Sequence, residues 1–266
     1  MHGAGGKIIR CRMDVLEEVY SFYDGFKGEK GVFGFSEEGR PLVYFLAGKG
    51  APVLLAQYAM HAREYVTAYV ALEEIKYLSE RDIEGSVYVL PLVNPDGVRI
   101  ALTRDKLWKA NAKGVDLNVN FDARWGTGAQ NKRTAGASDY IGEYPFSAAE
   151  SAALRNFTLR VMPDMTVSYH TKGEEIYWYF YQQGERAERD RALAEAAASL
   201  TGYAVRTPYS SAGGYKDWCV EKLSIPALTI EAGADWLPHP IGKERAAEIF
   251  RKNKDVPLEL IRRLKT

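Results

Sequence analysis

The apolar residues of this chain fall into short runs that alternate with longer stretches of helical spacing. Short runs rich in β-branched residues predict strands, and apolar positions three and four apart predict amphipathic helices. The predicted strands are 42–46, 52–56, 86–92, 164–170, 175–181 and 227–233. The predicted helices are 14–26, 65–78, 148–161, 186–200, a short one ending near 223, and 242–264. Asn94-Pro95-Asp96-Gly97 is a strong turn signal.

Strands that alternate with helices predict an α/β fold, a sheet with helices on both faces. At 266 residues, without a visible linker or internal repeat, the chain is expected to form one domain over 1–266. Residues 1–6 are expected to lie outside its folded part. Residues 103–146 lack periodicity but contain many Gly, Asn, Asp, Arg and aromatic residues, which predicts an ordered loop that contributes to a site.

Composition restricts the partners and the compartment. The formal net charge is zero and the basic residues are scattered, so neither nucleic acid nor a membrane surface is an expected partner. No apolar run approaches the roughly 20 residues of a membrane span. Cys11 and Cys219 make no disulfide framework, which fits a reducing compartment, although one bridge between them stays an alternative. We expect a cytoplasmic protein; export directed by a removed N-terminal segment stays open.

A His-x-x-Glu pair lies at a predicted junction between a strand and a helix. The spacing of His61 and Glu64 lets an imidazole nitrogen and a carboxylate oxygen reach one point, as in zinc sites built from two histidines and a carboxylate. Alone the motif is weak, since it arises by chance about one time in four. The alternative is a helix N-terminus at which Glu64 complements the helix dipole.

Two further residues strengthen this interpretation. His170 ends a predicted strand and is the natural third ligand; the alternative is a hydrogen-bonded surface histidine. Glu231 lies within an apolar strand, where a buried acid is costly unless it is paired, metal-bound or catalytic. It is either part of a buried salt bridge or a general base acting on water at the metal. His61, Asn94, His170 and Glu231 share the strand ends at which open α/β sheets bind ligands, which predicts metal-assisted amide hydrolysis.

At these motifs the sequence resembles the zinc carboxypeptidase family. His61-Ala62-Arg63-Glu64-Tyr65-Val66-Thr67 matches the family's His-Ser-Arg-Glu-Trp-Ile-Thr. The other motifs follow in family order: Asn94-Pro95-Asp96-Gly97, Asp116-Leu117-Asn118, Ser168-Tyr169-His170, Gly213-Gly214-Tyr215-Lys216-Asp217-Trp218 and Thr229-Ile230-Glu231. The resemblance runs from about Gly39 to the last helix. It implies a single-domain α/β fold with a mixed, twisted sheet and helices on both faces.

The resemblance also implies roles for individual residues. His61, Glu64 and His170 would bind one zinc ion per chain, and Glu231 would be the general base. Lys109 replaces an arginine that polarises the scissile carbonyl; a lysine supplies the charge but not the bidentate fork. The implied substrate-binding residues are Arg63, Asn118 and Tyr209.

Two positions depart from the carboxypeptidase pattern. Val119 stands where carboxypeptidases carry the arginine that clamps the terminal α-carboxylate of the substrate. Lys216 stands at the position facing the specificity pocket, which suggests a substrate side chain bearing a carboxylate; the alternative is a solvated helix lysine. Together they resemble the branch of γ-D-glutamyl-diamino acid peptidases, which cut bacterial cell-wall stem peptides. Arg124, and Lys132 or Arg133, are further candidates to bind the free carboxylates of such a substrate.

The sequence therefore predicts a zinc metallopeptidase that hydrolyses the γ-D-glutamyl–diaminopimelate bond of stem peptides or recycled muropeptides. The alternatives are a carboxypeptidase with atypical C-terminal recognition, a zinc-dependent deacylase of acidic amino-acid conjugates, and a zinc-binding recognition module without activity. No wall-binding repeat or export signal is visible, which favours a cytosolic enzyme acting on recycled muropeptides.

Overall fold

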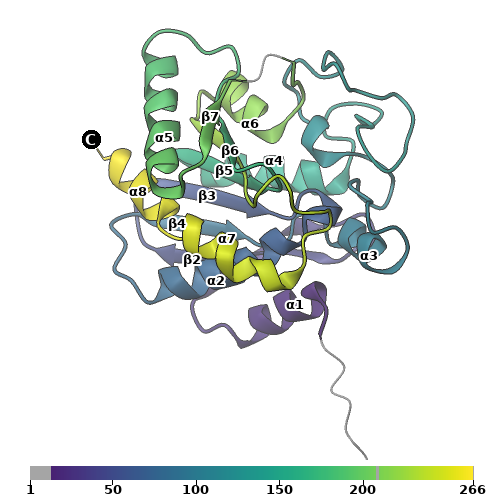
Figure 1. Ribbon diagram of the computed structural model, residues 1–266, viewed down its shortest axis with the longest axis horizontal. Helices are drawn as coiled ribbons and strands as arrows, with labels where there is room; N and C mark the ends of the chain where they lie inside the picture. Colours follow the sequence, from purple (N-terminus) through teal and green to yellow (C-terminus); the bar gives the residue numbers. More distant parts are fainter. Residues whose placement is uncertain (1–12, 208–209, 266) are drawn as a thin grey trace, which may run out of the picture.

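The structure, a computed structural model, describes residues 13–207 and 210–265. The expectations for residues 1–6, Cys11 and Tyr209 fall outside these ranges. At the centre is an eight-stranded sheet of order β1-β2-β4-β3-β5-β8-β6-β7 (Figure 1). The strands are β1 Glu29–Phe35, β2 Pro41–Gly48, β3 Val53–Tyr58, β4 Ser86–Leu90, β5 Met165–His170, β6 Glu175–Tyr177, β7 Ala204–Arg206 and β8 Ala227–Glu231.

The sheet is mixed, as predicted. Strands β4, β3, β5 and β8 run parallel, while β2 pairs antiparallel with both β1 and β4, and β6 pairs antiparallel with β8. Because the four central strands are parallel, their C-terminal ends lie along one edge of the sheet.

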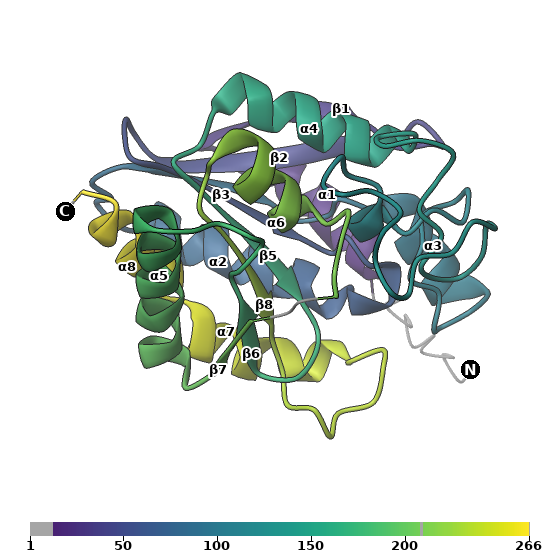
Figure 2. The same cartoon turned by 90° about the horizontal axis from the view of Figure 1, so that it is seen from above.

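Helices cover both faces of this sheet (Figure 2). One core contains residues of α1 (Val15–Gly25), α2 (Val66–Ser79), α5 (Glu185–Thr201), α7 (Ala246–Asn253) and α8 (Val256–Arg263). The core on the other face contains residues of α4 (Ala149–Val161) and α6 (Tyr215–Trp218). This arrangement confirms the predicted α/β fold.

Two elements differ from the prediction because glycine, proline and asparagine occur at helix starts and in strands as well as in turns. The predicted turn at 94–97 is the start of α3 (Pro95–Thr103). Asn94 Oδ1 accepts a hydrogen bond from the Gly97 backbone N–H at 2.9 Å, and Pro95 needs no donor in the first turn. Strand β1 was not predicted because Gly34 interrupts its alternation of apolar and polar residues. Glycine is needed at this position, since a Cβ there would lie 2.4 Å from Ala153 Cβ of α4.

Two other elements are shorter than predicted. The strand expected over 175–181 ends at Tyr177. The helix expected over 242–264 is divided into a 3₁₀ turn at Lys243–Arg245, then α7, then α8. Pro257 lies in the first turn of α8, where its missing N–H is tolerated, but it could not continue a helix from α7.

The loop between α3 and α4 is ordered by its own side chains, as expected of a site-forming segment. Asn120 is fully buried and its amide donates to Ile141 O at 2.8 Å and Tyr144 O at 3.1 Å. Its Oδ1 accepts from the Ala148 backbone N–H at 3.1 Å, at the start of α4. Figure 1 shows these loops, coloured teal, gathered at one end of the sheet.

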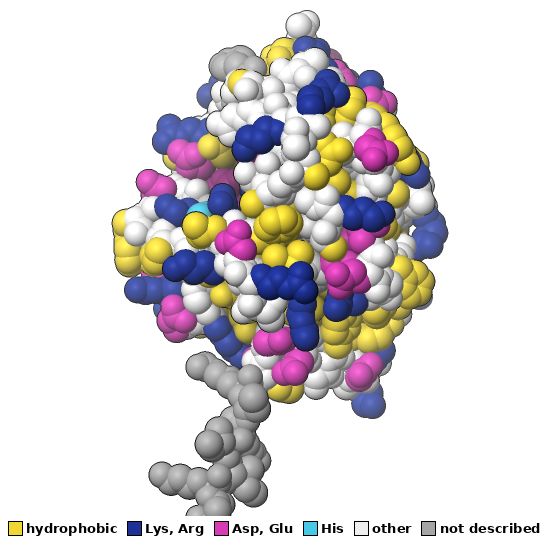
Figure 3. Space-filling view, turned by 90° about the vertical axis from the view of Figure 1, so that its right-hand side faces the viewer, with side chains coloured by type: hydrophobic (Ala, Val, Ile, Leu, Met, Phe, Trp, Pro, Cys, Tyr) yellow, Lys and Arg dark blue, Asp and Glu magenta, His cyan; other side chains and the backbone are white. Residues whose placement is uncertain are grey.

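Acidic and basic side chains are interspersed on the face of the molecule that Figure 3 presents. Within residues 13–207 and 210–265, no helix has the length and apolar character needed to cross a bilayer.

Candidate active site

The first two predicted ligands come from the junction between β3 and α2. A single 3₁₀ turn, Ala62–Glu64, follows His61. Thr67 Oγ1 fixes this junction, because it accepts from the Ala59 backbone N–H at 2.9 Å and donates to Glu64 O at 2.9 Å. As a result both side chains point to one place, with 3.0 Å between His61 Nδ1 and Glu64 Oε1.

The third predicted ligand comes from the neighbouring strand. His170 ends β5, which pairs parallel with β3. Its Nδ1 lies 2.9 Å from His61 Nδ1 and 3.0 Å from Glu64 Oε2. One ligand atom from each of the three residues therefore lies within 4.8 Å of the other two, and all three residues are buried.

This arrangement fits a metal ion. Two imidazole nitrogens that face each other across 2.9 Å repel through their lone pairs unless a proton or a cation lies between them. Two nitrogens and a carboxylate are a common protein ligand set for catalytic zinc, with Zn–N distances of about 2.0–2.1 Å. The donor set of His61, Glu64 and His170 therefore suits zinc.

Asp116 lies behind His61 and was not assigned a role from the sequence. Its Oδ1 is 3.3 Å from His61 Nε2, and its Oδ2 is 2.8 Å from Lys109 Nζ. Burial works to raise the pKa of Asp116, but the positive charge of Lys109 and the interaction with His61 outweigh it and hold that pKa well below its usual value. A carboxylate close to Nε2 favours a proton on that nitrogen, which leaves the Nδ1 lone pair directed at Glu64 and His170.

Glu231 ends β8 and pairs in register with His170. Burial raises the pKa of its carboxyl to about 7, and the charge of Glu64 adds to the rise while His170 opposes it. A carboxyl with a pKa near neutrality can both accept and return a proton, as a general base and acid must.

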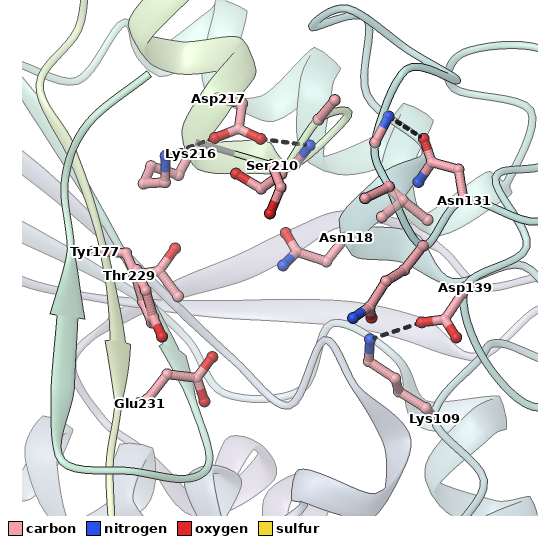
Figure 4. A pocket seen from close by; sticks show the side chains of 17 residues that line it. Lys109, Asn118, Asn131, Asp139, Tyr177, Ser210, Lys216, Asp217, Thr229 and Glu231 are labelled. Atoms are coloured by element: carbon pink, nitrogen blue, oxygen red, sulfur yellow. Dashed lines mark hydrogen bonds and ion pairs between the residues drawn. The ribbon is translucent and has the colours of Figure 1, made fainter. Parts of the chain in front are cut away.

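Glu231 faces a cavity of about 430 Å³ (Figure 4). Most of the lining residues are polar or charged. The lining consists of Lys109, Asn118, Val119, Gly128, Ala129, Gln130, Asn131, Asp139, Tyr177, Ser210, Ser211, Ala212, Gly214, Lys216, Asp217, Thr229 and Glu231. The loop between α3 and α4 supplies a large share of these residues, as expected.

Each lysine of this lining faces an acid. Lys109 Nζ lies 2.8 Å from Asp116 and 3.6 Å from Asp139. Lys216 Nζ lies 2.5 Å from Asp217 Oδ1. Lys216 therefore lines the cavity as expected, but its charge is already paired. The sequence motif contains Asp217 next to Lys216, and only the geometry shows that the two side chains meet.

Of the other predicted substrate-binding residues that the structure describes, Asn118 lines the cavity and Arg63 does not. Asn118 accepts from the Tyr215 backbone N–H at 3.3 Å. Arg63 directly precedes Glu64 in the chain, and its buried Nε has no hydrogen-bond partner within the described residues. Tyr209 lies outside the described residues.

The three basic residues suggested from the irregular loop do not line the cavity. Arg124 pairs with Glu221 at 2.9 Å, and its guanidinium stacks 3.4 Å from the centre of the Tyr181 ring. Lys132 pairs with Asp139 at 3.1 Å. Arg133 lies 4.7 Å from the centre of the Trp125 ring. In this structure their contacts hold the loop to itself and to neighbouring segments.

Comparison with known proteins places these features in one family. The family model described as zinc carboxypeptidase, of the M14 peptidases, matches residues 29–240. The γ-D-glutamyl-L-diamino acid endopeptidase 1 of Lysinibacillus sphaericus is 28% identical over 264 residues, which cover 86% of this chain and 65% of that protein. The chain thus spans less than two thirds of the length of this relative.

Solved structures share the fold. Bovine thrombin-activatable fibrinolysis inhibitor superposes with a TM-score of 0.83 at 20% identity, covering 94% of this chain and 96% of the other. The murein-tripeptide amidase of Escherichia coli O157 superposes with a TM-score of 0.67 at 25% identity, covering 90% and 95%.

Proposed function

This chain belongs to the zinc carboxypeptidase family, and on that premise we propose that it hydrolyses the amide bond between the γ-carboxyl of D-glutamate and a diamino acid in bacterial cell-wall peptides. The similarity to an endopeptidase named for this bond and to a murein-tripeptide amidase supports the proposal. The substrate would be a stem peptide or a released muropeptide.

In the proposed site, His61, Glu64 and His170 would hold zinc, which when bound would act as a Lewis acid on the scissile carbonyl and on water. The protein supplies the rest. The Asp116 carboxylate, 3.3 Å from Nε2, would favour the ring orientation of His61 that this role needs. Lys109 lines the cavity, and its ammonium places positive charge where the carbonyl oxygen becomes negative.

Glu231 carries the proton in this proposal. Its carboxylate accepts a proton from water as the water oxygen bonds to the amide carbon. The protonated carboxyl then donates that proton to the nitrogen of the leaving diamino acid as the C–N bond breaks. The pKa of about 7, raised by burial, suits a group that has to work in both directions near neutral pH.

One observation favours the γ-glutamyl substrate over an ordinary peptide C-terminus. A carboxypeptidase needs a cation free to clamp the terminal α-carboxylate. Among the described residues of the cavity lining, Val119 stands at the family's clamp position, Lys216 is paired with Asp217, and Lys109 is already assigned to the carbonyl oxygen. A bond inside a stem peptide needs no such clamp.

Peptide hydrolysis assays test the proposal. We expect L-Ala-γ-D-Glu-meso-diaminopimelate to be cut whether or not D-Ala follows the diaminopimelate, with similar kcat/KM for both peptides. Removal of a C-terminal residue from ordinary α-linked peptides, with no cleavage of either γ-linked peptide, would contradict it and favour a carboxypeptidase with atypical recognition.

The proposal also includes a cytoplasmic role in trimming recycled muropeptides. Cell fractionation with detection of the native protein tests this part. Accumulation of the protein in the culture medium would contradict it.

A further inference from the structure

Lys216 and Asp217 lie together at the end of the cavity opposite Glu231 (Figure 4). Both belong to α6, and Lys216 Nζ is 2.5 Å from Asp217 Oδ1. Their side chains are only 6% and 3% exposed, so this ion pair is largely shielded from bulk water. A side chain that enters the cavity from a bond cut at Glu231 would meet a positive and a negative group side by side.

The pair keeps hydrogen-bonding capacity for a ligand. Besides Asp217, Lys216 Nζ donates to Tyr179 O at 3.0 Å, so these two contacts use two of the three N–H donors of an ammonium group. Asp217 Oδ2 accepts from the Gly214 backbone N–H at 3.2 Å. Each carboxylate oxygen has two lone pairs, so Asp217 can accept further bonds.

The pairing determines which ligand charge is tolerated. A lone carboxylate that approached Lys216 would also approach the Asp217 carboxylate, and a lone ammonium that approached Asp217 would also approach Lys216. In a shielded cavity such like-charge contacts are costly. A group that carries both charges on one carbon can place its carboxylate at Lys216 and its ammonium at Asp217, so that each charge faces its opposite.

We infer that Lys216 and Asp217 together select a leaving amino acid whose side chain ends in an amino-acid zwitterion. meso-Diaminopimelate has such an end, lysine has only the ammonium, and 2-aminopimelate has only the carboxylate. The inference rests on the proposed function, because it takes the diamino acid as the residue that enters this cavity. Lys216 is here half of a zwitterion receptor, not a lone anion site.

The test compares four peptides, L-Ala-γ-D-Glu-X, in which X is meso-diaminopimelate, lysine, 2-aminopimelate or norleucine. The zinc-loaded wild type should show kcat/KM for diaminopimelate about tenfold or more above each of the other three. Lys216→Met should remove this preference and favour lysine, because Asp217 then faces an ammonium alone. Asp217→Asn should favour 2-aminopimelate instead.

Lys222→Met is the matched control. Lys222 lies a few residues further along the chain, has a 44% exposed side chain and is not among the cavity-lining residues. It should keep the wild-type ranking of the four peptides. Zinc content and thermal unfolding of all three variants show that they are folded.

A second series separates this inference from the proposed function. The same four amino acids are joined by an ordinary α-peptide bond to N-acetylalanine. Cleavage of this series alone would contradict the γ-glutamyl function, yet its ranking still decides the role of the pair. Calorimetric binding of the peptides to Glu231→Gln protein gives the ranking without turnover.

Equal kcat/KM or binding for diaminopimelate and norleucine in the wild type would overturn the inference. So would variants that weaken all four peptides by the same factor, since a purely structural ion pair has that effect. Opposite changes in preference for the two variants would support it.

Discussion

The carboxylate of Asp116 lies behind the imidazole of His61, with 3.3 Å between Oδ1 and Nε2. The other oxygen of the same carboxylate lies 2.8 Å from Lys109 Nζ. One buried acid therefore contacts both a proposed zinc ligand and the lysine proposed to face the scissile carbonyl. Asp116 thus links the proposed metal site to the Lys109 side of the cavity.

Asp116→Asn should weaken zinc binding by about 10–100-fold, because an amide no longer keeps the proton on His61 Nε2. Competition with a chromophoric chelator measures the affinity. Asp139→Asn is the control, since Asp139 also lies near Lys109 but is not paired with a ligand histidine. Unchanged zinc affinity in Asp116→Asn would show that His61 is oriented by other contacts.

Glu231→Gln should lower kcat by at least about 10²-fold while zinc content stays at the wild-type value. The amide keeps the shape of the side chain but accepts no proton from water. Steady-state assays and atomic absorption on the same samples separate the two effects. A variant that retained a large share of the activity would exclude Glu231 as the base, and loss of zinc would place it among the ligands.

Glu74 should make stability depend on pH. It lies in α2, is fully buried, and neither oxygen has a hydrogen-bond partner in the described part of the chain. Burial raises the pKa of its carboxyl well above the ordinary 4.5, and Asp255 adds to the rise. Above the ordinary pKa, the folded protein keeps a proton that the unfolded chain has released, so the unfolding free energy falls as pH rises through this interval.

Glu74→Gln should therefore gain stability over the wild type, by little near pH 4.5 and by about 1–3 kcal/mol near pH 8. Urea unfolding at several pH values measures this difference. Glu73→Gln, on the exposed side of the same helix, is the control and should show no such trend. A gain for Glu74→Gln that stayed constant with pH would mean that Glu74 is ionised in the folded protein.

Asn120→Ala should destabilise the fold by about 2–4 kcal/mol, because it leaves several buried backbone groups without partners. The amide contacts Ile141 O, Tyr144 O and the Ala148 N–H across the irregular loop. Asn131→Ala, which removes one hydrogen bond to Gly128 N, should cost less than about 1 kcal/mol. Equal losses in urea unfolding would show that the loop is held elsewhere.

The sequence was sufficient for the position of residues that lie at a strand end. His61, His170 and Glu231 each lie at or just beyond the end of an apolar run, and parallel strands bring such ends together. It was also sufficient for the fold class, because the alternation of strand and helix patterns determines it. The family resemblance indicated which of these strand ends lie together in one site.

The sequence was insufficient where a role depends on which neighbour a side chain meets. Asp217 is adjacent to Lys216 in the chain, but adjacency does not show that the two charges pair inside the cavity. Arg124 was a reasonable anion-binding candidate until the structure placed it against Tyr181 and Glu221. The Asn94-Pro95 signal serves a helix start as well as a turn, and local sequence alone does not separate the two.

The identity of the bond that this protein cuts is the first property to test. The most direct test is mass spectrometry of L-Ala-γ-D-Glu-meso-diaminopimelate incubated with the zinc-loaded protein, with Glu231→Gln as the control. We predict that the wild type alone releases free diaminopimelate and L-Ala-D-Glu. An intact peptide after incubation with a fully zinc-loaded, folded wild type would contradict the account.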